Sequence, residues 1–193
     1  MGKEMGSNFY NEKAKKNSNE LAWKTYKDLY HCIVEFLSQV PKNSLVLDLG
    51  CGRGCIAYLL YKKGFKNYVG IDFSSEILLR AKEQVPKFKF VVADIKNTET
   101  YEPYKECRVF IVSEVLEHII GDIQVLEKLP QDSLVVFSVP SYSAEAHVRY
   151  FRSSKEVKLR YNSVLDFNKG ESKVVLSGKG HKIFVFSATR KDG

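Results

Sequence analysis

Short apolar runs alternate with amphipathic and turn-forming segments along most of the chain. Periodic apolar residues predict a helix over 54–63, closed by Gly64, and another over 74–84, capped by Ser74. Continuous apolar runs, which are typical of strands buried on both faces, lie at 45–49, 68–72, 88–92, 109–113 and 134–139. This alternation predicts an α/β fold with a mainly parallel sheet and helices on both of its faces.

The C-terminal third of the chain has a different pattern. Strand-like segments lie at 164–167, 173–176 and 183–188, and the turn-forming run 177–180 separates the last two. Because the last two segments are joined by a short turn, we expect a hairpin that closes one edge of the sheet.

The N-terminal region, residues 1–40, combines aromatic and aliphatic residues near helical spacing with lysines between them. This pattern predicts one or two amphipathic helices. We therefore divide the chain into an N-terminal helical extension and a domain at 41–193. Tyr10 and Trp23 stand out in the extension, because each either contacts a ligand or packs against the helices of the domain.

Composition narrows the class of protein without naming a function. The 193 residues, 44% hydrophobic and 27% charged, fit one soluble globular domain. Since the chain has neither an apolar run long enough for a bilayer nor a secretory signal, we expect a cytoplasmic protein without a membrane partner. The net charge of +7 favours anionic partners. Four cysteines without disulfide or zinc-ribbon spacing are interpreted as reduced thiols, namely Cys32, Cys51, Cys55 and Cys107.

The first apolar run ends in an acid and three closely spaced glycines. Asp48 lies two residues before Gly50, and Gly52 and Gly54 follow at alternate positions. Glycine at these positions lets the backbone close over a nucleotide-like ligand and lets the next helix start close to the strand. The fingerprint of dinucleotide-binding oxidoreductases differs, because its third glycine comes one residue later and an apolar residue usually replaces the acid.

Acidic residues also end the next two predicted strands. Asp72 lies 22 residues after Gly50, where an acid can accept hydrogen bonds from both hydroxyls of a ribose. Asp94 has a similar place after the third strand. Either acid alone is common on a surface or in a helix cap, but acids at three successive strand ends predict a site for a nucleotide-like ligand.

The run Val46-Leu47-Asp48-Leu49, the glycines after it and the two later acids resemble the motifs of class I S-adenosylmethionine (SAM) methyltransferases over roughly residues 44–140. The resemblance implies a Rossmann-like α/β fold, a mainly parallel seven-stranded sheet with an antiparallel C-terminal strand, SAM as cofactor, and the extension as a lid. It also implies that Asp94 faces the exocyclic amine of an adenine held between Phe73 and Ile95. The implied cofactor-binding residues are Asp48, Gly50, Cys51, Gly52, Gly54, Asp72, Phe73, Asp94, Ile95 and Ser113.

A Glu-x-x-Glu-His sequence follows the fourth strand. If a helical turn begins at Ser113, the side chains of Glu114, Glu117 and His118 project toward one spot beside the transferable methyl group. The sequence resembles two O-methylating branches of the family, the ubiquinone-biosynthesis O-methyltransferases and the small-RNA 3′-terminal ribose 2′-O-methyltransferases. The second resemblance implies a divalent metal on these three residues and another histidine, for which His147 is the candidate.

Two alternatives to a metal stay open for the catalytic candidates. His118 either acts as a general base near neutral pH without a metal, or it only caps the turn. The chain departs from the RNA-modifying branch, since it has no downstream His-x-x-His-like element and His147 stands alone.

Segment 138–152 leaves the sheet at its ligand-binding edge and is the expected acceptor site. Tyr142, His147 and Arg149 are its candidate substrate-binding residues, because an arginine fork holds carboxylate or phosphate and an aromatic ring covers a flat substrate. The alternative is that the arginines are solvated and the aromatic rings only pack under the sheet.

The sequence thus predicts a SAM-dependent methyltransferase that modifies an oxygen of a small anionic or aromatic metabolite. An amine in a ring is disfavoured as acceptor, because no Asn/Asp-Pro-Pro motif follows the fourth strand. A non-catalytic SAM-binding protein is one alternative. The other is an RNA 2′-O-methyltransferase, with nucleic acid as a less favoured partner and a phosphate track formed by Arg149, Arg152, Lys155, Lys158 and Arg160.

Overall fold

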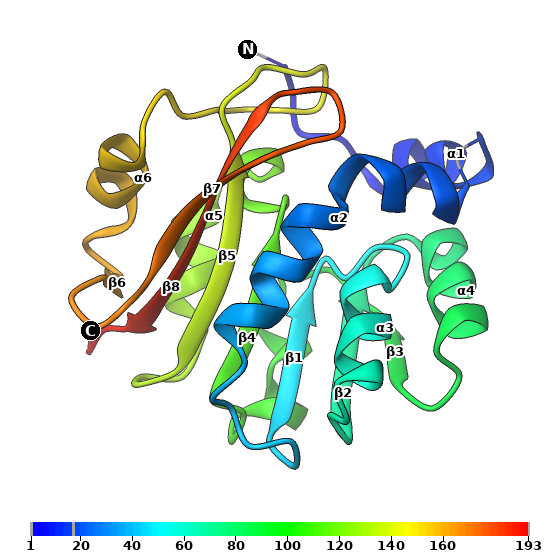
Figure 1. Cartoon of the computed structure of the whole chain (residues 1–193), viewed down its shortest axis with the longest axis horizontal. Coiled ribbons are helices and arrows are strands. Elements are labelled where there is room, and N and C mark those ends of the chain that lie inside the picture. The colour runs from blue at the N-terminus through cyan, green and yellow to red at the C-terminus, as the bar shows by residue number, and fades with distance from the viewer. Residues whose placement is uncertain (1, 17, 193) are drawn as a thin grey trace.

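An eight-stranded sheet forms the centre of the computed structural model, which describes residues 2–16 and 18–192 (Figure 1). The strand order is β3-β2-β1-β4-β5-β8-β6, and β7 also pairs with β8. The first five strands of this order are parallel to their neighbours, and β8 runs antiparallel to β5. The strands are β1 (Leu45–Leu49), β2 (Asn67–Asp72), β3 (Lys89–Val92), β4 (Val109–Ser113), β5 (Leu134–Pro140), β6 (Leu165–Asp166), β7 (Ser172–Leu176) and β8 (Lys182–Arg190).

This architecture confirms the predicted Rossmann-like α/β fold with an antiparallel C-terminal strand, but the sheet has eight strands where seven were expected. The difference lies beside β8. Strands β6 and β7 pair with successive parts of β8, and residues 167–171 separate them. The backbone at Gly170 lies so close to β8 that a Cβ there would sit 1.9 Å from the carbonyl oxygen of Ser187. The two strands correspond to the separate strand-like segments predicted at 164–167 and 173–176.

Helices cover both faces of the sheet (Figure 1). The predicted cap of the helix after β2 is confirmed, because Ser74 Oγ accepts a hydrogen bond of 3.3 Å from the backbone N–H of Ile77. The α-helices are α1 (Ser7–Lys16), α2 (Asn19–Phe36), α3 (Cys55–Lys62), α4 (Ser75–Gln84), α5 (Asp122–Glu127) and α6 (Ser154–Tyr161), and the 3₁₀ turns are η1 (Thr98–Thr100), η2 (Glu102–Tyr104) and η3 (Leu116–His118).

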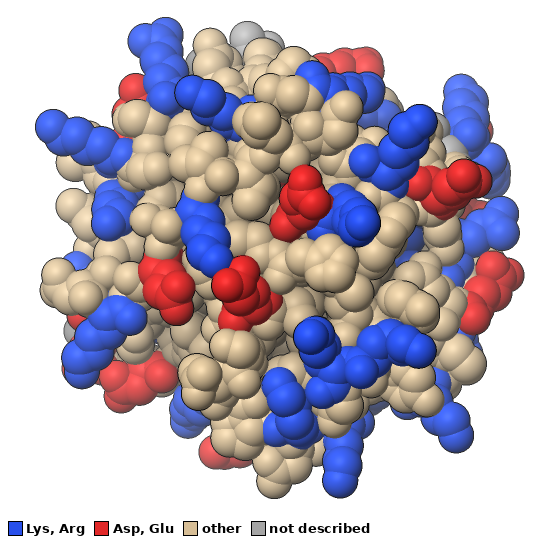
Figure 2. Space-filling view, viewed as in Figure 1, with Lys and Arg blue, Asp and Glu red and all other residues tan. Residues whose placement is uncertain are grey.

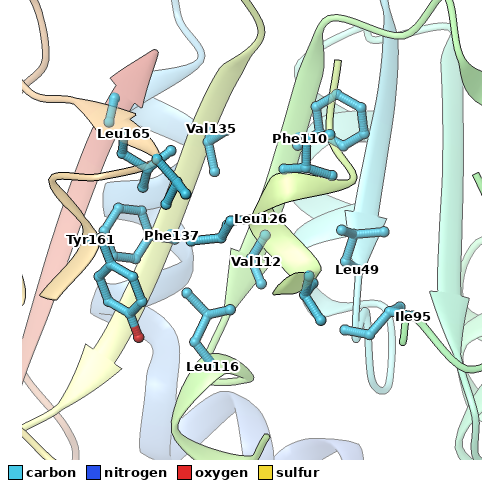
Figure 3. Close-up of a cluster of buried hydrophobic side chains, with 14 of the residues drawn as sticks. Leu49, Ile95, Phe110, Val112, Leu116, Leu126, Val135, Phe137, Tyr161 and Leu165 are labelled. Carbon is cyan, nitrogen blue, oxygen red and sulfur yellow. The ribbon is translucent and has the colours of Figure 1, made fainter. Parts of the chain in front are cut away.

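Two hydrophobic cores lie on opposite faces of the sheet, because successive side chains of a strand point to opposite sides. Val46 of β1 belongs to the core under α2 and α3, whereas Leu47 belongs to the core under α5 and α6. Figure 3 shows the second core, in which Phe137 of β5 lies between Val112 of β4 and Tyr161 of α6. The buried apolar runs therefore form the sheet, and the parallel strands of the sheet place their carboxyl ends side by side.

The N-terminal region is tied to the domain in two ways. Leu29 and Ile33 of α2 are almost fully buried in the core under α2 and α3. Helix α1 instead contacts α4, at the edge of the sheet where β1 and β2 end (Figure 1). Among the described residues, no helix has the length and apolar character needed to cross a membrane.

Candidate functional site

The glycine loop after β1 has the backbone geometry that its sequence predicts. Gly50, Gly52 and Gly54 have φ angles of +74°, +52° and +76°, a region that other residues rarely adopt. A Cβ at Gly50 would lie 2.4 Å from Val115 Cγ2, and one at Gly54 would lie 3.0 Å from the Cβ of Ala81 in α4. Glycine is therefore required both for the fold of the loop and for the close approach of its neighbours.

A cavity of about 200 Å³, called here the first cavity, opens beside this loop. Strand ends and the turn after β4 form one side of it, and the segment before α1 forms the other. Its lining comprises Glu4, Met5, Tyr10, Gly50, Gly52, Asp72, Phe73, Ile77, Ala93, Asp94, Ile95, Lys96, Glu114, Val115, His118 and Ile119. Six of the ten predicted cofactor residues are in this set, namely Gly50, Gly52, Asp72, Phe73, Asp94 and Ile95.

Asp72 links the glycine loop to the start of α4. Its Oδ2 accepts a hydrogen bond of 3.1 Å from Gly52 N–H, and its Oδ1 accepts one of 2.9 Å from Ser74 N–H. Burial raises the pKa of Asp72 to about 6, although these backbone donors oppose the shift. Since each carboxylate oxygen has a second acceptor site, Asp72 can still bind two hydroxyl groups of a ligand.

The segment before α1 closes the first cavity through Glu4. Its Oε1 lies 2.6 Å from Lys96 Nζ, and its Oε2 accepts a hydrogen bond of 2.8 Å from Ile120 N–H. Asp94 is fixed from the same side, because its Oδ1 accepts a hydrogen bond of 2.9 Å from the backbone N–H of Lys96. Glu4 and Met5 were not predicted to line the site, because the local sequence does not show that this segment packs beside strands that come much later in the chain.

Four predicted cofactor residues lie outside the lining of the first cavity, namely Asp48, Cys51, Gly54 and Ser113. Asp48 is 1% exposed and accepts a hydrogen bond of 2.7 Å from the hydroxyl of Tyr68. Burial raises the pKa of Asp48 to about 7. Ser113 Oγ pairs with Ser138 Oγ at 3.1 Å. These contacts join side chains of neighbouring strands, β1 to β2 and β4 to β5.

A second cavity of about 520 Å³ lies on the other side of the turn after β4. It shares Tyr10, Glu114 and His118 with the first cavity. Groups bound in the two cavities would therefore both lie against these three side chains. The remaining lining is Lys13, Leu21, Ala22, Thr25, Tyr26, Arg53, Glu117, Tyr142, Ser143, Ala144, His147, Ser177, Lys179 and His181.

Glu114 lies at the junction of the two cavities in an unusual backbone conformation. Its φ of +54° is in the left-handed region although it carries a side chain, which marks a position that its surroundings strongly constrain. Ser138 provides that constraint, because its hydroxyl accepts from Glu114 N–H at 3.0 Å and donates to Glu114 Oε1 at 3.1 Å. Burial raises the pKa of Glu114.

Glu117, His118 and His147 form a cluster at the second cavity, with one ligand atom of each lying within 4.8 Å of the others. His118 Nδ1 lies 2.8 Å from the carbonyl oxygen of Ala146, and His147 Nδ1 lies 3.0 Å from that of Tyr142. Because a carbonyl oxygen only accepts, each Nδ1 carries the proton and each Nε2 presents a lone pair. Burial lowers the pKa of His118 to about 4, so its ring is neutral near pH 7.

Glu117 is the unusual member of this cluster. Its side chain is 0% exposed, and neither carboxylate oxygen has a hydrogen-bond partner among the residues that the structure describes. A buried carboxylate without a donor is costly, and such groups are normally paired or bound to a metal. His118 Nε2 lies 3.5 Å from Glu117 Oε1, and both histidines have Nδ1 held by a backbone carbonyl, which is the arrangement of typical metal ligands. The cluster therefore has the donor set of a divalent-cation site, with Glu114 outside the group of converging atoms.

The predicted acceptor residues separate into two groups. Tyr142 lines the second cavity with His147, and its hydroxyl lies 3.3 Å from that of Tyr26. Arg149 lines neither cavity. Its guanidinium donates to the carbonyls of Leu116, Ile119 and Ile120 and lies 3.2 Å from Asp122 Oδ2, so it holds the turn after β4 in place.

Sequence reasoning missed several residues of the second cavity. Lys13 comes from α1, Arg53 from the glycine loop, and Lys179 and His181 from the turn between β7 and β8. The sequence indicated only a turn at 177–180. Trp23, the second aromatic candidate of the extension, lies 5.8 Å from the ring of Tyr30 and lines neither cavity.

Comparison with known proteins shows similarity to methyltransferases. The family model described as a methyltransferase domain matches residues 46–130. The trans-aconitate 2-methyltransferase of Escherichia coli O139:H28 is 28% identical over 123 residues, which cover 60% of this chain and 48% of that enzyme. The chain thus spans about half the length of the curated relatives it matches.

Solved structures show the same fold. The N-methyltransferase NodS of Bradyrhizobium japonicum WM9, determined with S-adenosyl-L-homocysteine (SAH), has a TM-score of 0.72 at 14% identity and covers 93% of this chain and 96% of its own. The 1,6-didemethyltoxoflavin-N1-methyltransferase of Burkholderia thailandensis, also with SAH bound, has a TM-score of 0.70 at 15% identity, with coverage of 97% and 92%. At these identities the likeness establishes a methyltransferase fold.

Proposed function

We propose, on the premise of the methyltransferase fold and of the family match over residues 46–130, that this chain is a SAM-dependent methyltransferase acting on an oxygen of a small anionic or aromatic metabolite. The observation that carries the proposal is the junction of the two cavities at Tyr10, Glu114 and His118. A donor in the first cavity and an acceptor in the second would face each other there, and such alignment is a major source of rate acceleration.

The polar and apolar side chains that line the first cavity suit SAM. Asp72 has acceptor capacity for both ribose hydroxyls, and Asp94 has it for the exocyclic amine of adenine. Phe73 and Ile95 line the same cavity and would cover the two faces of the ring. The structural neighbours with bound SAH support this assignment, and Asp48 acts indirectly by bonding β1 to Tyr68 of β2.

SAM supplies an electrophilic methyl group, whose bond to sulfur breaks with the electron pair left on sulfur while a lone pair of the acceptor oxygen forms the new bond. This chain holds the acceptor hydroxyl at the junction and accepts its proton. Glu114 is suited to take the proton, because it lines both cavities and burial raises its pKa toward the range in which a base works near neutral pH.

We propose that Glu117, His118 and His147 hold a divalent cation beside Glu114. A cation there would lower the pKa of the acceptor hydroxyl and fix its oxygen. The unpartnered carboxylate of Glu117 favours this proposal over a metal-free site in which His118 is the base, because a metal-free site leaves Glu117 buried without a partner. A purely structural role for His118 also leaves that carboxylate unexplained.

Transfer of labelled methyl from SAM to a panel of hydroxylated carboxylic acids and phenols tests the proposal. We expect activity that is lost on exhaustive chelation and restored by a divalent cation. The Glu117→Gln variant should stay inactive after the cation is restored, whereas Glu127→Gln, which changes an exposed glutamate of α5, should match the unchanged protein. Full activity after chelation would refute the metal, and SAH binding without transfer to any oxygen acceptor would favour the non-catalytic alternative.

The RNA alternative has less support. Arg149 and Arg160, two members of the expected phosphate track, both bind the buried carboxylate of Asp122. Figure 2 shows basic side chains spread over the face in view with acidic side chains among them. A protein that follows a nucleic-acid backbone usually gathers its positive charge in one stripe. We therefore favour a small acceptor.

A further inference from the structure

We infer that the turn between β7 and β8, residues 177–181, is the acceptor-recognition element, and that Lys179 and His181 bind an oxyanion group of the acceptor. The inference rests on the proposed function and adds to it a chemical class and two residues. The acceptor would carry a carboxylate or phosphate at the hairpin end of the second cavity and its methyl-accepting oxygen at Glu114. An aromatic framework between the two groups would lie against rings that line the cavity.

The turn is built more tightly than an ordinary hairpin tip. Ser177 organises it, because its Oγ accepts from Lys179 N–H at 3.3 Å and from His181 N–H at 3.2 Å. Its backbone N–H donates to His181 at 2.8 Å, and its carbonyl accepts from Gly180 N–H at 2.8 Å. Gly180 has a φ of +78°, which closes the turn without strain. The backbone positions of Lys179 and His181 are therefore fixed beside the cavity.

The turn is also docked on α2, more than a hundred residues earlier in the chain. Gly178 N–H donates a hydrogen bond of 2.7 Å to the carbonyl oxygen of Thr25. A Cβ at position 178 would lie 2.7 Å from the carbonyl oxygen of Lys24, so only glycine allows this approach. Thr25 lines the second cavity itself. The docking holds the turn against the wall of the cavity.

A series of ring contacts connects His181 to the candidate metal ligands. The rings of His181 and Tyr142 stack with centroids 4.5 Å apart and planes at 24°. The ring of Tyr142 lies 5.2 Å from that of His147, and His147 lies 4.8 Å from His118. An acceptor in this cavity therefore has a row of rings beside it, with the turn at one end and the proposed site of chemistry at the other.

The charges around the second cavity favour an anion. Lys13, Arg53 and Lys179 line it, and Arg53 is held in place by hydrogen bonds of 3.1 Å to Asn19 Oδ1 and 3.0 Å to the carbonyl oxygen of Ala14. The lining also contains two carboxylates, Glu114 and Glu117, so the three cationic side chains leave it with a net positive charge. Lys179 makes no ion pair within the part of the chain that the structure describes, so its ammonium group is available to a ligand.

Calorimetric titration of the full chain with three anionic probes, protocatechuate, trans-aconitate and inorganic phosphate, tests the inference. We expect at least one of them to bind, and Lys179→Ala to weaken its binding about tenfold or more, as expected for the loss of a charge-assisted hydrogen bond. His181→Ala should weaken it as well. Lys182→Ala removes the same charge from the next lysine along the chain, which lies outside the cavity lining, and should leave binding unchanged. The neutral methyl ester of protocatechuate should bind more weakly than the acid.

Failure of all three probes to bind the unchanged protein would overturn the inference, and so would equal effects of Lys179→Ala and Lys182→Ala. Tight, salt-dependent binding of a short single-stranded RNA through Lys179 would also overturn it in favour of a nucleic-acid acceptor. SAH titration of the same variants separates the two claims. If the unchanged protein does not bind SAH, the proposed function is refuted. If all variants bind SAH equally well, their weaker anion binding is due to the turn alone.

Discussion

Replacing Glu117 with leucine should make the cation-free protein more stable. The carboxylate of Glu117 is 0% exposed and unpartnered among the described residues, and burial raises its pKa well above the ordinary carboxyl range. Leaving such a group without a partner costs about 1–3 kcal/mol. An apolar side chain of similar size removes this cost, so the melting temperature under chelation should rise by about 2–4 °C for each kcal/mol gained.

A bound cation should reverse this order. It stabilises only a protein that keeps its ligands, by about 2.7 kcal/mol when its concentration is about 100 times its dissociation constant. We therefore expect Mg²⁺, Mn²⁺ or Zn²⁺ to raise the melting temperature of the unchanged protein and to leave the melting temperature of Glu117→Leu unchanged. This reversal of the order of melting temperatures distinguishes a metal site from a buried carboxylate that only destabilises the fold.

Thermal unfolding followed by circular dichroism, first with chelator and then with each cation, measures both effects. Glu127→Leu is the matched control, because Glu127 is exposed on α5 and lies outside the cluster. A Glu117→Leu protein that is less stable than the unchanged one under chelation would refute the argument from burial. A melting temperature that no divalent cation moves would refute the site.

Three further predictions concern stability and the first cavity. Burial raises the pKa of Asp48 from 3.8 to about 7, so the stability it contributes is complete below the lower value and is lost as the pH rises through the higher one. The free energy of unfolding in urea should therefore fall by up to about 4 kcal/mol across this range, and Asp48→Asn should flatten the fall. Asp122→Ala leaves Arg160, Arg149 and the hydroxyl of Tyr161 without their buried acceptor and should cost about 3–5 kcal/mol in the same assay, whereas Lys173→Ala, which breaks the exposed pair with Glu35, should change little. Gly50→Ala should weaken SAH binding strongly, because its Cβ would lie 2.4 Å from Val115 Cγ2 at a φ of +74°, and SAH affinity equal to that of the unchanged protein would contradict the assigned role of the loop.

Local sequence was sufficient to predict the sheet, and it indicated six residues that line the first cavity. Apolar runs such as Leu45–Leu49 form the buried strands, and parallel strands bring Asp72, the last residue of β2, and Asp94, two residues after β3, to the same end of the sheet. The same logic fails for Asp48, which lies within the strand and is therefore covered by Tyr68. The break at 167–171 agrees with the separate strand-like segments predicted at 164–167 and 173–176, and Gly170 makes a close backbone contact with β8 there.

The acceptor side depends on contacts between distant segments, which sequence pattern does not show. Arg149 was expected at the acceptor, but Asp122 and three carbonyl groups hold its guanidinium elsewhere. His147 looked isolated in the sequence, and only the path of the chain after β5 brings it to Glu117 and His118. Lys179 gave no signal beyond a turn, because its position depends on the docking of Gly178 onto α2.

Calorimetric titration with SAH tests the central claim most directly, because it requires no knowledge of the acceptor. The unchanged protein should bind SAH in the first cavity, and Asp72→Ala, checked for folding by circular dichroism, should weaken binding by about tenfold or more through loss of the ribose hydrogen bonds. Absence of SAH binding, or equal affinity in the folded Asp72→Ala variant, would contradict the account.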